Sequence, residues 1–217
     1  KTFVSGGGAL DPEIGIFLNS IGLPTLQGYG LTETSPVVSC NPIEDIRIDT
    51  VGIPFRCNNV KIAEDGEILV KGENVMLGYW NKKAETDKVL VDGWLHTGDI
   101  GKFVNGFLKI TDRKKDILIT PGGDNISPVK VETALNNSNY IDQSLVYGDN
   151  KPYLVALLVL NTEIDINEKN LSDEIEKINK NLTKIEKIKK FFVIKEKFSI
   201  ENGMLTPTLK LKRYKII

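Results

Sequence analysis

The chain has 217 residues, of which 41% are hydrophobic and 26% are charged, and its formal net charge is −1. This composition is ordinary for a globular protein of one large or two small domains, and the lack of a basic surplus argues against nucleic-acid binding. The two cysteines, Cys40 and Cys57, have no CxxC spacing, so we expect neither a disulfide scaffold nor a zinc site, and a reducing compartment is favoured. No apolar run approaches the roughly 20 residues of a membrane span.

Residues 1–50 are predicted to form a piece of an α/β domain. The predicted order is strand, glycine turn, helix, strand and loop, at residues 2–4, 5–8, 11–21, 25–26 and 28–35. Asp11 is a good helix N-cap because proline and a carboxylate follow it. Open α/β sheets bind ligands at the carboxyl ends of their strands, so the two loops are candidate binding segments.

Residues 51–114 are predicted to form a small β-barrel-like subdomain. The turn signals Asp65-Gly66 and Asn105-Gly106 each join two β-rich runs, which is typical of hairpins. The four strands are expected at residues 59–62, 67–70, 102–104 and 107–110.

Residues 115–217 are predicted to form a small α+β domain, and the charged run 112–116 marks the boundary. The expected elements are strands at 117–119, 145–147, 153–160 and 191–195, and helices at 128–135 and 173–190. Ser127 and Pro128 favour a helix start. The second helix is amphipathic and lysine-rich, which would also fit a membrane-surface or partner-binding helix, but its mixed charges favour an ordinary solvated face.

The most informative segment is Gln27-Gly28-Tyr29-Gly30-Leu31-Thr32-Glu33-Thr34-Ser35. Its glycines allow the backbone to approach a ligand, and the tyrosine offers a flat face to a base. The threonine hydroxyl can donate to a phosphate, and the lone carboxylate suits Mg²⁺. The alternative is a glycine-rich turn before a solvated loop.

Four further side chains are candidates for chemistry, each with a plainer alternative. Asp99 can accept both hydroxyls of a ribose, or it can stabilise a turn. Arg113, one of four arginines among 28 basic residues, suggests a need for planar forked donors, although a surface ion pair is the alternative. Lys210 lies on an extended loop and can reach into a cleft, or it is one more exposed lysine. His96, the only histidine, has no partner at a suggestive spacing, so we expect a structural role.

Taken together, the chain resembles the adenylate-forming acyl-CoA synthetase superfamily, and most closely its long-chain fatty acid–CoA ligase branch. Five motifs in the family's order carry the resemblance: Gly28–Ser35, Gly66–Tyr79, Gly93–Gly101, Asp112–Val131 and Leu205–Arg213. The resemblance implies that a carboxylate attacks the α-phosphorus of Mg-ATP, giving an acyl adenylate and pyrophosphate. The thiol of coenzyme A then displaces AMP.

The resemblance also implies roles for the residues of the first two segments. Tyr29, between Gly28 and Gly30, would stack on adenine, Thr32 would contact the α-phosphate, and Glu33 would hold Mg²⁺. The loop Ser5–Ala9, with Gly7 and Gly8, would form the other wall of the adenine and acyl pocket. Asp99 and Arg113 would bind the ribose.

In the C-terminal segment the resemblance implies two half-reactions served by one mobile domain. Lys115 matches the hinge, and Lys210 matches the adenylation lysine. Gly122 and Gly123 match the loop that completes the pantetheine tunnel. Leu209 stands where many relatives have glycine, so Lys212 remains an alternative for the catalytic lysine.

We expect the sequence to be part of a longer enzyme, because the family's phosphate-binding loop and most of its large domain lie upstream of these motifs. Such a chain would be incomplete for catalysis alone. The implied ligands are ATP, Mg²⁺, coenzyme A and a fatty acid, in the cytoplasm, and peripheral membrane contact is left open. The alternatives are a ligase for medium-chain, aryl or amino acids, or a non-catalytic nucleotide-binding module.

Overall fold

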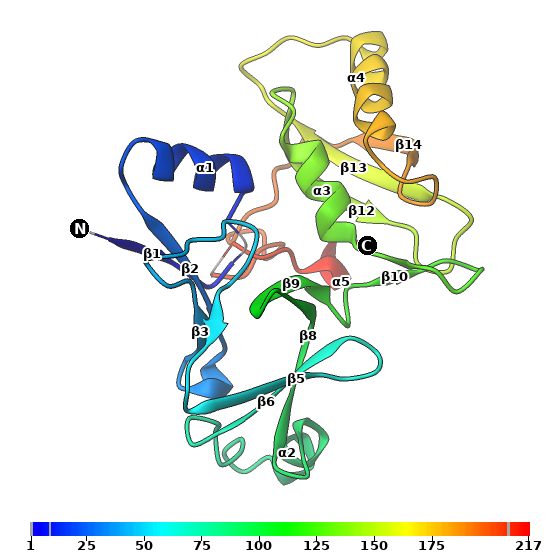
Figure 1. The fold of residues 1–217 in the computed structure, drawn as a ribbon. Coiled ribbons are helices and arrows are strands. Elements are labelled where there is room, and N and C mark those ends of the chain that lie inside the picture. Colours follow the sequence, from blue (N-terminus) through cyan, green and yellow to red (C-terminus); the bar gives the residue numbers. More distant parts are fainter. Residues whose placement is uncertain (1, 9, 208) are drawn as a thin grey trace. The chain divides into compact units, whose positions relative to one another are not determined.

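The computed structural model describes residues 2–8, 10–207 and 209–217, which form two compact units divided between Lys115 and Asp116 (Figure 1). No helix in these described ranges is long and apolar enough to cross a membrane.

The first unit opens with a small sheet in the order β1-β2-β3-β4. Its strands are Phe3–Ser5, Thr25–Gly30, Val37–Cys40 and Ile53–Pro54. Helix α1, Pro12–Ser20, connects the parallel pair β1 and β2, and Asp11 caps it by accepting from the amides of Glu13 and Ile14. The predicted helix is therefore confirmed.

The glycine-rich segment is partly strand rather than loop, which corrects the prediction for residues 28–35. Strand β2 continues to Gly30 and pairs with β3, and a single turn of 3₁₀ helix, Thr32–Thr34, follows. An ideal Cβ on Gly30 would lie 1.7 Å from the carbonyl oxygen of Pro36. This glycine is thus required by the close approach of the chain to itself.

The second sheet of this unit contains five antiparallel strands, β5 to β9. They span Asn58–Ile62, Glu67–Gly72, Leu90–Val91, Trp94–Val104 and Phe107–Arg113. Both predicted hairpins are confirmed, with positive φ at Gly66, Asn105 and Gly106. Strand β8 begins at Trp94, so Asp99 lies within a strand and not in a turn. Helix α2, Lys83–Val89, was not predicted.

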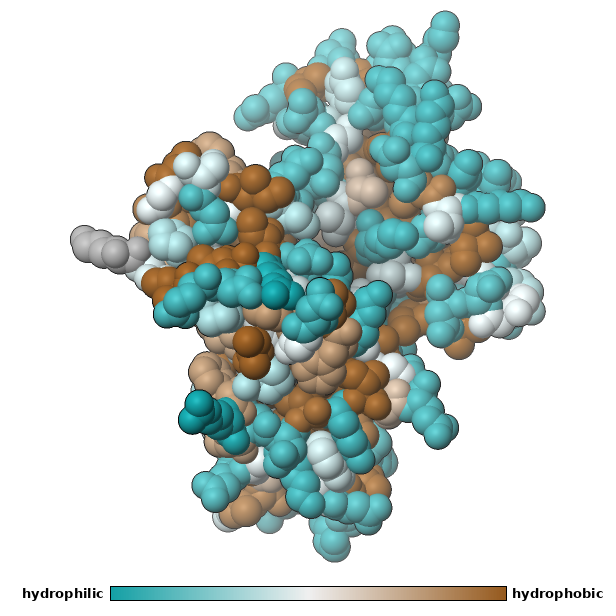
Figure 2. Space-filling view, viewed as in Figure 1, coloured by the Kyte–Doolittle hydropathy of each residue, from teal (hydrophilic) through white to brown (hydrophobic). Residues whose placement is uncertain are grey.

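One apolar core joins the two sheets of the first unit and so fixes β2 against β6 and β9. Its buried members are Tyr29, Val38, Ile68, Val70 and Leu108. By contrast, β1 and α1 carry several exposed apolar side chains (Figure 2), namely Phe3, Val4, Ile14, Ile16 and Phe17. Apolar side chains exposed in such number are typical of contact surfaces.

The second unit contains the sheet β12-β13-β14, the hairpin β10-β11 and three helices. The strands are Leu118–Ile119, Asn125–Ile126, Ile141–Tyr147, Leu154–Leu160 and Ile188–Val193, and helices α3, α4 and α5 span Pro128–Asn136, Glu168–Lys180 and Arg213–Ile216. Alternate residues of β12 and β13 enter two cores. One core is shared with α3 and α4, and the other is shared with the C-terminal segment.

The predicted helix over 173–190 is wrong in both of its bounds. Helix α4 begins at Glu168 and ends at Lys180, and Ile188 belongs to strand β14. The side chain of Asn179 pairs with the amide and carbonyl of Ile188 at 2.8 and 2.9 Å, which fixes the chain reversal. Ile175 and Ile188 pack in the same core, so one apolar stripe spans two elements.

Candidate active site

A hydrogen-bonded cluster of Tyr29, Asp99 and Arg113 forms the centre of the site. Asp99 on β8 lies opposite Arg113 on β9, whose Nε donates to Oδ1 over 3.0 Å. The Tyr29 hydroxyl, from β2, donates to Oδ2 over 2.7 Å. Asp99 is only 4% exposed and Tyr29 only 8%. Burial and the nearby Asp99 carboxylate raise the pKa of Tyr29, so its hydroxyl remains a donor at neutral pH.

This arrangement holds the Asp99 carboxylate in one orientation while each oxygen keeps a further lone pair. A ribose diol could use those acceptor positions. The Tyr29 ring packs in the core that joins the two sheets, so the ring and the carboxylate are positioned together.

Thr32 and Glu33 lie on the 3₁₀ turn directly after β2. Thr34 holds this turn, because its Oγ1 accepts from the amide of Leu31 over 2.9 Å and bonds the Pro36 carbonyl over 2.8 Å. Thr32 is exposed, and the half-buried Glu33 accepts from the Tyr79 hydroxyl over 2.8 Å. Burial and the bond to Glu33 raise the pKa of Tyr79 to about 12, so the hydroxyl is a donor at neutral pH.

An open cavity of 330 Å³ lies beside Glu33 in the first unit. Its lining residues are Leu31, Glu33, Glu67, Tyr79, Lys88, Val89, Leu95, His96, Thr97, Gly98 and Lys114. Gly98 directly precedes Asp99, so the cavity and the Tyr29 cluster are adjacent along β8. The structure joins Tyr29, Asp99 and Arg113 by hydrogen bonds, whereas Glu33 alone among these four predicted site residues lines the cavity.

The glycines of the first unit that were predicted as site residues differ in their surroundings. A Cβ on Gly7 or Gly8 would meet no atom within 4 Å, so this loop leaves open space beside it, whereas Ala9 lies outside the described residues. A Cβ on Gly28 would lie 3.3 Å from the carbonyl of Ser39. Tight backbone packing thus involves Gly28 and Gly30, and Gly7 and Gly8 border free volume.

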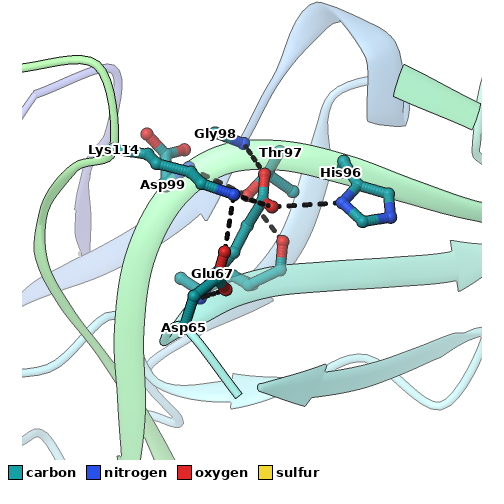
Figure 3. Close-up of polar contacts among 8 residues, drawn as sticks. Asp65, Glu67, His96, Thr97, Gly98, Asp99 and Lys114 are labelled. Atoms are coloured by element: carbon teal, nitrogen blue, oxygen red, sulfur yellow. Dashed lines mark hydrogen bonds and ion pairs between the residues drawn. The ribbon is translucent and has the colours of Figure 1, made fainter. Parts of the chain in front are cut away.

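Glu67 is a buried site residue that the sequence analysis missed (Figure 3). Its carboxylate accepts from Lys114 Nζ at 2.9 Å and from the Gly98 amide at 2.9 Å, and lies 3.1 Å from His96 Nδ1. Lys114 also contacts Asp65 at 2.6 Å. Burial opposes ionisation of Glu67, but these hydrogen bonds outweigh it and hold its pKa below the usual range. His96, which we expected to be structural, therefore has a carboxylate partner and also lines the cavity.

A magnesium ion in this site would depend on Glu33. Among the described residues, no group of three or more histidine, cysteine or acidic side chains could hold a metal ion. Mg²⁺ in nucleotide sites commonly uses one or two carboxylates and completes its shell with phosphates and water. The half-buried Glu33 carboxylate at the cavity wall fits that donor set.

The other candidates lie at the unit boundary or in the second unit. Lys115 is an exposed turn residue at the end of the first unit. Gly122 and Gly123 occupy the turn between β10 and β11, with a φ of 88° at Gly123. Lys210 is exposed, and its amide and carbonyl bond Thr206 at 3.0 and 2.8 Å. Lys212, its alternative, donates its amide to the Met204 carbonyl.

The C-terminal segment that carries Lys210 is anchored by an ion pair to a buried carboxylate, another feature the sequence did not indicate. Arg213 contacts both carboxylate oxygens of Glu132 at 2.7 and 2.6 Å. Glu132 also accepts from the amide of Val146 at 2.7 Å. The two-point contact between Arg213 and Glu132 therefore connects the segment to α3 and β12.

Two family profiles match the chain. Residues 1–80 match the AMP-binding enzyme profile, and residues 115–207 match the AMP-binding enzyme C-terminal domain. Among curated relatives, the long-chain-fatty-acid–CoA ligase FadD15 of Mycobacterium bovis is 36% identical over 98% of this chain. The long-chain-fatty-acid–CoA ligase 5 of Rattus norvegicus is 35% identical over 94% of the chain. The chain spans 39% and 35% of these two relatives.

Solved structures give the same picture. The o-succinylbenzoate coenzyme A synthetase (MenE) of Bacillus subtilis in complex with AMP has a TM-score of 0.84 and 30% identity, over 100% of this chain and 45% of the other. The same enzyme with ATP and a magnesium ion has a TM-score of 0.81 and 30% identity, over 99% of this chain and 46% of the other. These likenesses confirm the predicted fold class, a partial adenylate-forming α/β domain with a β-rich subdomain and a small α+β domain. The chain belongs to the adenylate-forming superfamily of AMP-binding enzymes and resembles its long-chain acyl-CoA ligases.

Proposed function

We propose that the chain is part of an ATP-dependent long-chain fatty acid–CoA ligase. The fatty acid carboxylate attacks the α-phosphorus of ATP to give acyl adenylate and pyrophosphate, and the thiol of coenzyme A then attacks the acyl carbon and releases AMP. The observation that carries this proposal is the convergence of Tyr29 and Arg113 on both oxygens of buried Asp99. The first step needs positioning and charge neutralisation more than covalent catalysis.

In this proposal the first unit binds the nucleotide. Asp99 and Arg113 bind the ribose hydroxyls, Tyr29 contacts the adenine, and Thr32 donates to the α-phosphate. The backbone at Gly7 and Gly8 borders the adenine and acyl pocket, and Gly28 and Gly30 shape strand β2. Glu33 would hold Mg²⁺, which neutralises phosphate charge when bound.

The unit boundary and the second unit supply the remaining groups. Lys210 stabilises charge on the phosphate during adenylate formation, and Lys115 is the hinge between the two half-reactions. Gly122 and Gly123 line the path of the coenzyme A pantetheine. The exposed apolar side chains of β1 and α1 and the 39% coverage of FadD15 support a working enzyme that is longer than this chain.

The test is thioester formation by the full encoded protein with ATP, Mg²⁺, coenzyme A and one acid at a time. Long-chain acids such as hexadecanoate should give the highest kcat/KM, well above octanoate, benzoate and o-succinylbenzoate. The 30% identity to MenE supports the second candidate, a ligase for another carboxylic acid. Preference for an aryl acid would favour that candidate, and nucleotide binding without turnover would favour a non-catalytic module.

A further inference from the structure

We propose that Tyr79 is the positioning residue for Glu33. Its hydroxyl fixes carboxylate oxygen Oε1, so that Oε2 is presented to the nucleotide-bound cation. This inference rests on the proposed function, in which Glu33 holds Mg²⁺, and it assigns a role to a side chain from a separate segment, 46 residues further along the chain.

The segment that carries Tyr79 bonds the Glu33 turn at three points. Asn74 Nδ2 donates to the Thr34 carbonyl over 2.8 Å, and the Met76 amide donates to the Glu33 carbonyl over 2.8 Å. The Tyr79 hydroxyl then donates to Glu33 Oε1 over 2.8 Å. One short segment therefore holds both the main chain and the side chain of Glu33.

Tyr79 is itself held at its backbone. Its amide donates to Thr86 Oγ1 over 2.9 Å, and that hydroxyl bonds the Lys82 carbonyl over 3.1 Å, at the start of α2. Gly78 has a φ of 148°, and a Cβ there would lie 2.8 Å from Thr86 Cγ2. The hydroxyl is thus presented from a fixed backbone.

The neighbours of Tyr79 show that its inward placement is selective. Leu77 is 102% exposed and Trp80 is 89% exposed, whereas Tyr79 is half-buried and lines the same cavity as Glu33. A carboxylate on a flexible glutamate side chain loses rotamer freedom when it binds a cation. A hydroxyl that already fixes one carboxylate oxygen reduces the entropy that is lost on cation binding. Hydrogen-bond partners of metal ligands commonly raise metal affinity in this way.

The experiment uses Tyr79→Phe in the full encoded protein, since this change removes only the hydroxyl. Loss of one such hydrogen bond should raise the half-saturating Mg²⁺ concentration for adenylate formation about five-fold. The kcat at saturating Mg²⁺ should be largely restored. Mn²⁺ binding in the presence of ATP, followed by electron paramagnetic resonance, should weaken by a similar factor. Trp80→Phe is the matched control, one residue away and solvent-exposed, and should change neither value.

A double-mutant cycle with Glu33→Gln completes the test. In the Glu33→Gln background, Tyr79→Phe should have no further effect on the Mn²⁺ affinity. Folded Tyr79→Phe protein with unchanged or tighter cation binding would overturn the inference, because the hydroxyl would then be neutral or competing. If the wild-type protein forms no adenylate with any acid, the proposed function fails instead, and the two failures are distinguishable.

Discussion

Arg113 Nε donates to Asp99 Oδ1 over 3.0 Å across the paired strands β8 and β9. The register that places these two residues opposite each other also leaves Oδ2 for the Tyr29 hydroxyl. Tyr29, 70 residues from Asp99, thereby joins the β8–β9 pair in one hydrogen-bonded cluster in which two donors match two acceptor oxygens. A nucleotide-binding role for Asp99 depends on this match.

Asp99→Asn should weaken ATP binding about ten-fold or more, because the two donors use separate carboxylate oxygens, of which the amide keeps only one, and the charge paired with Arg113 is lost. Its NH₂ group must face either Tyr29 or Arg113. Isothermal titration calorimetry with ATP and AMP measures the effect. Asp45→Asn is the matched control, since Asp45 pairs with Arg47 at the exposed surface. Equal nucleotide affinity in folded Asp99→Asn and wild-type protein would remove Asp99 from the site.

Glu67→Gln should make the stability of the first unit less dependent on pH. The pKa of Glu67 is lowered in the folded state, so its stabilising contribution is complete above about 4.5, near the unfolded value, and is lost as the pH falls through the folded pKa. At pH 7 the variant should lose about 1–3 kcal/mol of unfolding free energy. Denaturant unfolding at a series of pH values measures this difference.

The control for Glu67→Gln is Glu85→Gln, an exposed carboxylate paired with Lys88. It should leave the stability profile close to that of the wild type. If Glu67→Gln and wild-type protein show parallel profiles from pH 7 into the acid range, the Glu67 network does not contribute as described.

Gly30→Ala should destabilise the first unit by at least about 2 kcal/mol, because the new methyl group would collide with the Pro36 carbonyl 1.7 Å away. Thermal unfolding measures the loss. Gly8→Ala is the matched control, since its Cβ would meet no atom within 4 Å. Similar melting temperatures for the two variants would contradict the described backbone contact.

Features encoded by adjacent residues were predictable. The turns at Gly66 and at Asn105-Gly106 need positive φ, which glycine and asparagine supply, and both hairpins are confirmed. The start of α3 is equally local: Ser127 Oγ accepts from the amide of Lys130, and Pro128 follows at the first helical position.

Features that depend on distant partners were not predictable from spacing. Glu67 became visible only when Lys114 and His96, 47 and 29 residues away, were placed beside it. The predicted helix over 173–190 extended too far. Ile188 packs in the same core as the apolar side chains of α4, but it belongs to strand β14. The residue types of the site came from resemblance to the family. The contact of Tyr29 with Asp99, 70 residues apart, required the fold.

Arg213→Lys should loosen the C-terminal segment, because lysine cannot reproduce the two-point contact with buried Glu132. We expect a loss of about 1–3 kcal/mol in the second unit. Hydrogen exchange of the Val146 amide, which bonds Glu132, should accelerate. Arg56→Lys, at an exposed position, is the control. An unchanged exchange rate of the Val146 amide would show that the contact between Arg213 and Glu132 does not anchor this segment.

We propose that this chain forms the nucleotide site of a fatty-acid-activating ligase. Fatty-acid-dependent ATP–pyrophosphate exchange in the full encoded protein tests it most directly. Exchange is expected with Mg²⁺ and a long-chain acid present, and it should be absent without the acid and lost in Lys210→Ala. Folded protein that shows no exchange with any carboxylic acid would contradict the ligase function, and exchange that survives Lys210→Ala unchanged would contradict the role of Lys210.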